Sequence, residues 1–309
     1  MKQLPNADIY PKQGWHIETI VQELKQIRQK WRDEHSPLAK NAGHYFPSHE
    51  VLQHVVKTIA HVLFPLRLGP AHLNTETEDY YVGLKLDTAL NSLFSQVKLE
   101  LAYQHQAKND LLDDDYHLEL IAKQLVYDFA KTLPAIRSLL DLDILAAFNG
   151  DPAAHTVDEV LICYPGIKAI LYHRIAHQLY LKDLYLIARI IAELAHSETG
   201  IDIHPGAQIE SGFFIDHGTG VVIGETAVIG KNVRLYQAVT LGAKSFPKNA
   251  DGSLQKGLPR HPTLEDDVVI YAGATVLGSI TVGKGSTIGS NVWLTHAVPP
   301  NSYIAQSSH

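Results

Sequence analysis

Between Ile203 and Leu241, apolar residues recur at every sixth position, a period that strongly restricts the possible folds. One series is fully apolar and a second keeps the same period; they consist of Ile203, Ile209, Ile215, Val221, Ala227, Val233 and Val239, and of Ile223, Ile229, Leu235 and Leu241. An amphipathic helix would repeat in steps of three and four, and a half-buried strand in steps of two. Neither pattern fits this stretch.

A six-residue repeat with glycine after the apolar residue is typical of a parallel β-helix built from hexapeptides. Glycine follows Ile223, Ile229 and Leu241. Each hexapeptide supplies one short strand and one corner, and three of them make a coil of about 18 residues. The repeat resumes in two later series, Leu264, Ile270, Val276, Val282, Ile288 and Leu294, and Val268, Ala274, Ile280, Ser286, Val292 and Val298.

Two interruptions of the repeat predict where functional groups gather. Ile215 and Ile223 are eight residues apart, so Asp216 and His217 fall at an irregular corner. A polar segment rich in Gly and Pro, from about 243 to 262, has no repeat and predicts a protruding loop. Long loops in compact solenoids are usually functional.

The first part of the chain predicts helices. Apolar residues at helical spacing predict segments from Trp15 to Arg32, Val51 to Phe64, about Glu76 to Gln104, about Tyr116 to Leu133, from Pro134 onward, and Tyr185 to Ala195. The expected fold class is α+β multidomain, with an all-α domain over 1–198, of which 1–75 would be an extension, and a parallel β-helix over 199–309. The last helices would cap the open end of the β-helix.

Composition predicts a cytoplasmic protein without a nucleic-acid or membrane partner. The formal charge is −7, Cys163 is the only cysteine, and the sequence holds neither a stretch of about 18 uncharged apolar residues nor a signal peptide at its start. We expect Cys163 to be a buried, inert thiol.

An aspartate and a histidine are spaced to meet on adjacent coils. Asp202 and His217 are 15 residues apart, close to one coil. A carboxylate beside an imidazole fixes its tautomer and stabilises the imidazolium, and histidine titrates near neutral pH. The alternative is that Asp202 only caps a turn through its own backbone.

Five motifs together resemble serine O-acetyltransferase, over roughly 151–300. They are Asp202-Ile203-His204-Pro205, Asp216-His217-Gly218-Thr219-Gly220, Gly224-Glu225-Thr226-Ala227-Val228, Val239-Thr240-Leu241-Gly242 and Arg260-His261-Pro262. The resemblance implies transfer of acetyl from acetyl-CoA to the hydroxyl of L-serine, the first step of cysteine biosynthesis, by direct attack in a ternary complex. It also implies that the β-helix is left-handed.

The resemblance also implies a role for each candidate residue. His217 would be the general base and Asp202 its orienting carboxylate. Arg260, with His261 beside it, would hold the serine carboxylate. Asp216 and Asp151 would face the serine amine and hydroxyl. Taken alone, Asp151 before Pro152 also fits a helix N-cap, and Arg260 a solvated loop cation.

Further expectations concern assembly and ligands. Similar proteins form trimers through the prism and often hexamers, with coenzyme A in the groove between subunits, for which Gly242, Ala272 and Gly273 are candidate lining. Cysteine is expected to inhibit by competing for the serine site. Many relatives end in a tail with a terminal Ile that docks into O-acetylserine sulfhydrylase; this chain ends in Ser308-His309, so that partnership is not expected. No metal is expected.

Three alternatives remain open from the sequence. The first is an acetyltransferase for another acceptor, such as a sugar or homoserine. The second is a metalloenzyme of the γ-carbonic anhydrase kind, with His204, His217 and His261 as ligands. The third is a non-catalytic scaffold.

Overall fold

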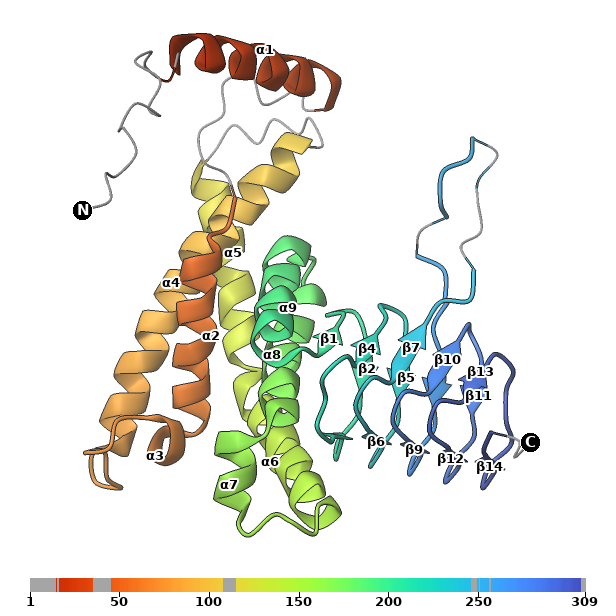
Figure 1. Cartoon of the computed structure of the whole chain (residues 1–309). Coiled ribbons are helices and arrows are strands. Elements are labelled where there is room, and N and C mark those ends of the chain that lie inside the picture. Colours follow the sequence, from red (N-terminus) through yellow and green to blue (C-terminus); the bar gives the residue numbers. More distant parts are fainter. Residues whose placement is uncertain are drawn as a thin grey trace, which may run out of the picture.

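A computed structural model describes residues 15, 17–35, 46–107, 115–245, 249, 251–255 and 257–306, and it divides into a helical part and a β-helical prism (Figure 1). The helices of the described residues are α1 (Ile17–His35), α2 (His49–Leu63), α3 (Pro65–Leu68), α4 (Glu78–Ala107), α5 (Asp115–Ala130), α6 (Leu133–Gly150), α7 (Val157–Cys163), α8 (Pro165–Tyr180) and α9 (Tyr185–Thr199). The predicted helices are thus present, with bounds that shift by a few residues.

Local sequence explains where several helices begin. Ser48 and Thr156 accept hydrogen bonds from the backbone N–H groups of Val51 (3.4 Å) and Glu159 (3.0 Å), so both act as N-caps. Proline stands in the first turn of α3, α6 and α8, where its missing N–H costs nothing.

The prism consists of three parallel sheets whose strands are stacked coil upon coil. Its strands are β1 (Asp202–Ile203), β2 (Gln208–Ile209), β3 (Phe214–Ile215), β4 (Val222–Ile223), β5 (Val228–Ile229), β6 (Arg234–Leu235), β7 (Thr240–Gly242), β8 (Thr263–Leu264), β9 (Val269–Ile270), β10 (Thr275–Leu277), β11 (Thr281–Val282), β12 (Thr287–Ile288), β13 (Trp293–Leu294) and β14 (Tyr303–Ile304). The sheets have the orders β1-β4-β7-β10-β13, β11-β8-β5-β2 and β14-β12-β9-β6-β3. The predicted fold class, helices followed by a left-handed parallel β-helix, is confirmed.

Strand register explains both six-residue series. Ile203 pairs with Ile223 and Ile223 with Leu241, so the second residue of each strand points into the prism. A separate column of buried residues lines the corners; it includes Val221, Ala227, Val233 and Val239. The first predicted series therefore combines two columns, because the eight-residue step from Ile215 to Ile223 changes the phase.

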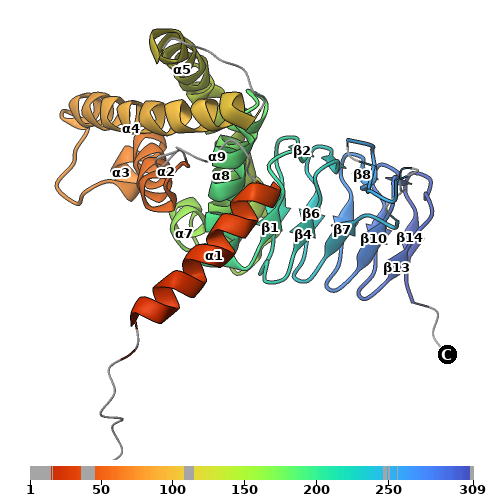
Figure 2. The same cartoon turned by 90° about the horizontal axis from the view of Figure 1, so that it is seen from above.

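The helical part covers the first coil of the prism (Figures 1 and 2). A buried ion pair within the helical part contacts the prism. Arg174 of α8 donates through Nε (2.7 Å) and Nη2 (2.9 Å) to the two carboxylate oxygens of Asp143 on α6. Asp143 also accepts from the backbone N–H of Phe213 (2.9 Å), and Arg174 donates to the carbonyls of Ile209 and Glu210. Side chains of two helices thereby bind the backbone of the first coil.

The structure contradicts one expectation from the sequence, the burial of Cys163, and agrees with another, the protruding loop. Cys163, expected to be buried, is exposed, because α7 is short and of its residues only Val160 is buried. No helix among the described residues is long and apolar enough to cross a bilayer. Between β7 and β8 the chain leaves the prism in the predicted loop (Figure 1).

Candidate active site

Asp216 and His217 lie on an irregular corner between β3 and β4. The two extra residues of this coil form a tight turn, in which Gly218 N–H donates to Asp216 O (2.7 Å). Gly220 N–H donates to the carbonyl of Gly200, the residue that follows α9 (2.8 Å). His217 has a φ of 58°, a left-handed conformation that non-glycine residues seldom adopt. Such strained backbone is often found at functional sites, because the surrounding fold must hold it.

The His217 imidazole is exposed and faces a carboxylate. Its side chain is 68% exposed, and its Nδ1 lies 3.6 Å from Oδ1 of Asp216, which is itself largely covered. Asp202, the predicted orienting residue, lies half-buried at the start of β1, paired with Val222. Burial lowers the pKa of His204, and the negative charge of Asp202 acts in the opposite direction by raising it. Within the described residues, the carboxylate in contact with His217 is therefore that of Asp216.

Asp151 follows α6 and joins the same corner. Its Oδ2 accepts a short hydrogen bond from the Tyr164 hydroxyl, and its Oδ1 accepts from Ala153 N–H (2.8 Å). The Tyr164 bond and then the Ala153 bond lower the pKa of Asp151, and the His217 ring and Arg234 add to this. The same bond raises the pKa of Tyr164 to about 12. Asp151 is thus held anionic at this corner rather than serving as the N-cap of a following helix.

Arg260 lies at a different corner, where the protruding loop returns to the prism. Its Nη2 makes a close ion pair with Oε2 of Glu225, whose Oε1 accepts from the Tyr180 hydroxyl (2.9 Å). The ion pair lowers the pKa of Glu225 against the opposing effect of burial. Arg260 is therefore an anchored cation with N–H groups to spare, and not a freely solvated one.

His261 is buried beside Arg260 with a defined hydrogen-bonding state. Its Nδ1 accepts from the backbone N–H of Thr226 (3.1 Å) and lies 2.8 Å from the Thr226 hydroxyl. Burial first, and the Arg260 charge second, lower its pKa to about 4. The ring is neutral at pH 7, so its proton is on Nε2, which can donate to a ligand. The ring packs on Gly224, where a Cβ would lie 2.0 Å from it.

Five of the six candidate residues therefore form two groups at opposite ends of β4. We call Asp151, Asp216 and His217, which precede β4, the base corner; we call Arg260 and His261, which pack against Glu225 and Thr226 after β4, the cation corner. Asp202 lies between them on the neighbouring strand β1. Ladder hydrogen bonds hold β4 between β1 and β7, which keeps the two corners at the two ends of this strand.

The candidate coenzyme residues divide in the same way. Ala272 and Gly273 precede β10, on the side of the base corner, whereas Gly242 ends β7, on the side of the cation corner. Gly273 has a φ of 71° and would place a Cβ 2.2 Å from Oδ1 of Asn291. Within the described residues, no group of three or more His, Cys, Asp or Glu side chains could hold a metal ion.

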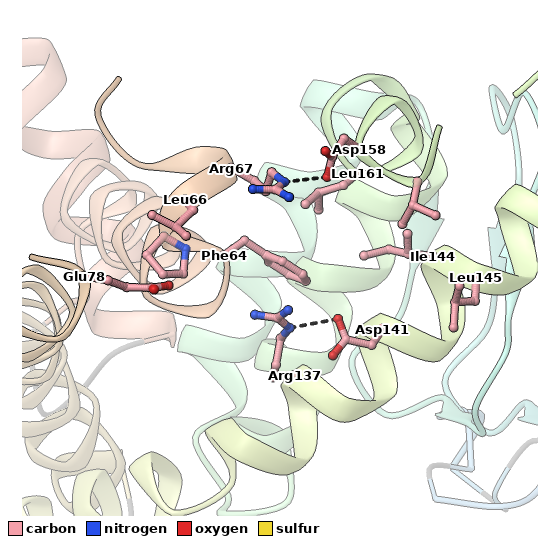
Figure 3. A pocket seen from close by; sticks show the side chains of 12 residues that line it. Phe64, Leu66, Arg67, Glu78, Arg137, Asp141, Ile144, Leu145, Asp158 and Leu161 are labelled. Atoms are coloured by element: carbon pink, nitrogen blue, oxygen red, sulfur yellow. Dashed lines mark hydrogen bonds and ion pairs between the residues drawn. The ribbon is translucent and has the colours of Figure 1, made fainter. Parts of the chain in front are cut away.

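Cavities of the described residues lie along α1, within the helical part, and beside the cation corner. One of about 390 Å³ lies between α3, α6 and α7, with the ion pairs Arg67–Asp158 and Arg137–Asp141 at its wall, and holds none of the candidate residues (Figure 3). A second, of about 420 Å³, is lined by Cys163 and Tyr164 among others. A third, also about 420 Å³, opens at the cation corner and is lined by Tyr180, Tyr185, Arg189, His204, Pro205 and Glu225.

Known proteins resemble the whole chain. The family model described as bacterial transferase hexapeptide (six repeats) matches residues 261–296. A plasmid serine acetyltransferase of Synechococcus elongatus is 52% identical over 296 residues, which cover 96% of this chain and 92% of that protein. The chain belongs to the serine acetyltransferase family. The family and the class of enzyme predicted from the sequence, an acyltransferase, are confirmed.

Solved structures of serine acetyltransferases share the fold. That of serine acetyltransferase 1 from Entamoeba histolytica in complex with L-cysteine is 34% identical, with a TM-score of 0.70 over 93% of this chain and 99% of that one. A serine acetyltransferase in complex with CoA is 26% identical, with a TM-score of 0.52 over 82% of this chain and 95% of that one.

Sequence reasoning missed the residues that hold the candidate groups. Glu225 stands in one of the five motifs, but the motif does not say what Glu225 contacts, and no sequence pattern marks Tyr164. Tyr180 sits in an ordinary helical pattern and gave no signal of its contact with Glu225. Tyr164 is 13 residues from Asp151, Glu225 is 35 residues from Arg260, and Tyr180 is 45 residues from Glu225, so only the fold brings these pairs together.

Proposed function

We propose that this serine acetyltransferase transfers acetyl from acetyl-CoA to the hydroxyl of L-serine in a ternary complex, with His217 as the general base. The observation that carries the proposal is the base corner, where an exposed imidazole lies 3.6 Å from the Asp216 carboxylate and acts on the charge of Asp151, on backbone with a positive φ. An ammonium group facing these carboxylates would bring the serine hydroxyl beside the imidazole.

The reaction needs one base that works in both directions. His217 takes the proton from the serine hydroxyl while its oxygen attacks the thioester carbonyl, and the resulting imidazolium returns the proton to the departing thiolate. Asp216, 3.6 Å from Nδ1, stabilises the imidazolium between these steps. The orienting role of Asp202 remains part of the proposal, since its place beside β4 leaves it near this corner.

The cation corner supplies hydrogen-bond donors for a carboxylate, which the base corner lacks. Arg260 has N–H groups beyond the one that Glu225 binds, and His261 offers Nε2–H as a neutral donor. Together they suit a carboxylate, whereas Asp151 and Asp216 suit an ammonium group. A zwitterionic amino acid needs both sets, which a sugar acceptor does not.

We infer that the complete site forms between two subunits. Because the two corners lie at opposite ends of β4 in one chain, a serine held by both requires the base corner of one copy and the cation corner of another. A closed ring of copies that joins unlike faces repeats this contact at every interface, and a trimer around the prism would contain three such sites. Gly242 and the pair Ala272 and Gly273 divide between the same faces, as expected for a coenzyme groove at that interface.

Ligand complexes of similar proteins support both ligands. The serine acetyltransferase with CoA and that with L-cysteine share this fold. We propose that acetyl-CoA is the co-substrate here and that cysteine competes with serine, since it presents the same ammonium and carboxylate. Lack of inhibition by millimolar cysteine would remove the second proposal.

The metalloenzyme alternative would use His204, His217 and His261 at the same interface between copies. Nδ1 of His261 already accepts from Thr226, so only its Nε2 could bind a metal ion. Metal analysis of the purified protein tests this alternative.

The deciding experiment is thiol release from acetyl-CoA with L-serine, with L-homoserine and without an acceptor. Serine-dependent release should fall at least about 1,000-fold in His217→Ala, by loss of base catalysis and of positioning. His117→Ala is the matched control, because His117 is exposed on α5. Release that is independent of serine, or that survives in His217→Ala, contradicts the proposal.

A further inference from the structure

Helix α1 carries a row of large apolar side chains in solvent. Ile17, Ile20, Leu24 and Ile27 are 62%, 49%, 46% and 66% exposed, and Val21 beside them is 47% exposed. None of the contacts between α1 and other elements is extensive enough to bury this row. The row lies on one face because the residues recur in steps of three and four.

A helix of this kind needs a partner. It has 19 residues, and most of the stability of a helix in a protein comes from packing of its apolar face rather than from intrinsic helix propensity. Exposed rows of isoleucine and leucine on a soluble protein mark interaction surfaces. The spacing of the apolar residues in α1 indicates what kind of partner covers the row.

The spacing is that of a coiled-coil seam. Ile17, Leu24 and Trp31 are seven residues apart and occupy the a positions of a heptad, and Ile20 and Ile27 occupy the d positions. Val21 adds an apolar e position in the first heptad, whereas Arg28 occupies the e position of the second. The apolar stripe therefore narrows along the helix to the a and d positions, which in a coiled coil face another helix.

Charges beside the seam favour a parallel copy of the same helix. Glu23 is at a g position and Arg28 at the following e position, the pair that meets between neighbouring strands of a parallel, in-register coiled coil. A membrane surface is the poorer partner, since helices that lie on anionic lipid are rich in Lys and Arg. Here four of each sign balance: Lys25, Arg28, Lys30 and Arg32 against Glu18, Glu23, Asp33 and Glu34.

We propose that α1 associates with α1 of other copies of this chain in a parallel, in-register coiled coil. Isoleucine or leucine at the first two a positions, with isoleucine at both d positions, favours three or four strands over two, which is compatible with the trimer proposed above. The proposal rests only on α1 and stands or falls independently of the reaction.

The test is disulfide cross-linking in the full-length protein. The native thiol is exposed, so all variants carry Cys163→Ser. Leu24→Cys places a thiol in the seam, where parallel neighbours bring identical positions together. Gln22→Cys, at the outward f position, is the matched control. Under mild oxidation, Leu24→Cys should yield at least about five times more covalent dimer than Gln22→Cys.

A second substitution checks that the seam causes the cross-link. Ile20→Lys puts a charge into the seam one turn away and should reduce the dimer yield of Leu24→Cys at least about fivefold. Serine-dependent thiol release, which needs no α1 residue, should stay unchanged and reports that each variant is folded. Equal cross-linking of the two cysteine variants, no cross-link at Leu24→Cys, or cross-linking only when Leu24→Cys is mixed with Ile27→Cys, as an antiparallel pair would give, overturns the proposal.

Discussion

The Tyr164 hydroxyl donates a hydrogen bond to the Asp151 carboxylate and ties the residue after α6 to the residue before α8. This bond is the first cause of the lowered pKa of Asp151. It holds the carboxylate anionic and fixes its direction toward the base corner.

Tyr164→Phe should therefore weaken serine binding more than the chemical step. We expect KM for serine to rise about threefold to tenfold, with a smaller change in kcat, because one hydrogen bond to a charged group is lost. The lowered pKa of Asp151 moves up in the variant, so the acid limb of kcat/KM shifts to higher pH. The measurement is a pH profile of kcat/KM.

Tyr80→Phe serves as control, since Tyr80 is exposed on α4. A profile of Tyr164→Phe that superimposes on that of the wild type would show that the bond does not set the charge of Asp151.

Gly224 provides a steric test of the cation corner. A Cβ at this position would lie 2.0 Å from the His261 ring, so Gly224→Ala must displace the ring or the loop that carries it. We expect a loss of at least about tenfold in kcat/KM for serine, by analogy with small displacements of catalytic groups. Steady-state kinetics at saturating acetyl-CoA measure it.

Gly83→Ala is the matched change, because a Cβ there meets nothing within 4 Å. As a helical glycine it should gain stability of about 0.5–1 kcal/mol at unchanged activity. Full activity in Gly224→Ala would mean that His261 is not needed in its observed place.

The fold was predictable because the inward positions of a β-helix repeat strictly. Even Ser286, a polar member of the later series, is buried in its column, with its hydroxyl donating to Pro299 O (3.0 Å). The interruptions of the repeat were also predictable, and Asp216, His217, Arg260 and His261 lie at them, whereas Asp202 lies on the regular strand β1 and Asp151 lies outside the prism. What periodicity does not encode is contact across coils, and the Glu225–Arg260 pair depends on a 35-residue offset that includes the whole protruding loop.

The buried ion pair and the single cysteine also show what the sequence pattern does not predict. Asp143 and Arg174 occupy helical positions where burial predicts apolar residues, so the sequence pattern gives no sign that the two are paired. Cys163 was expected in the core because free cysteine is usually buried, yet it lies in the last turn of a short helix that buries only Val160.

Loss of Asp143 should loosen the helical part from the prism. Asp143→Ala leaves the Arg174 guanidinium buried without its counter-ion and should lower the free energy of unfolding by about 3–5 kcal/mol. The double variant Asp143→Leu/Arg174→Met should regain part of this loss, because an apolar pair has no unpaired charge. Urea unfolding compares the three proteins, and a change below about 1 kcal/mol in Asp143→Ala would contradict the prediction.

Acid should destabilise the protein partly through His261. Its pKa falls from the ordinary 6.5 to about 4 on folding, so the unfolded chain binds more protons between these values. The stabilisation is full above pH 6.5 and is lost as the pH falls toward 4. Between pH 7 and pH 5 this group should account for a loss of about 1–2 kcal/mol.

His261→Asn keeps an acceptor for Thr226 but does not titrate. Between pH 7 and pH 5, the free energy of unfolding of this variant should therefore fall by about 1–2 kcal/mol less than that of the wild type. His117→Ala, which removes an exposed histidine, should keep the dependence of the wild type. Identical slopes in His261→Asn and the wild type would show that other groups carry the acid sensitivity.

Division of the site between subunits predicts complementation of two inactive variants. His217→Ala damages the base corner and Arg260→Ala the cation corner, and in one chain these lie at opposite ends of β4. In co-expressed, mixed rings, an interface that joins the base corner of an Arg260→Ala copy to the cation corner of a His217→Ala copy is intact. Random mixing at equal amounts makes about a quarter of the interfaces intact, so activity should return to about a quarter of the wild-type value. Mixing after separate purification, without exchange of subunits, should restore none. If co-expression also restores none, while each variant alone folds and assembles, then both corners must serve a site within one chain, and the proposed interface is wrong.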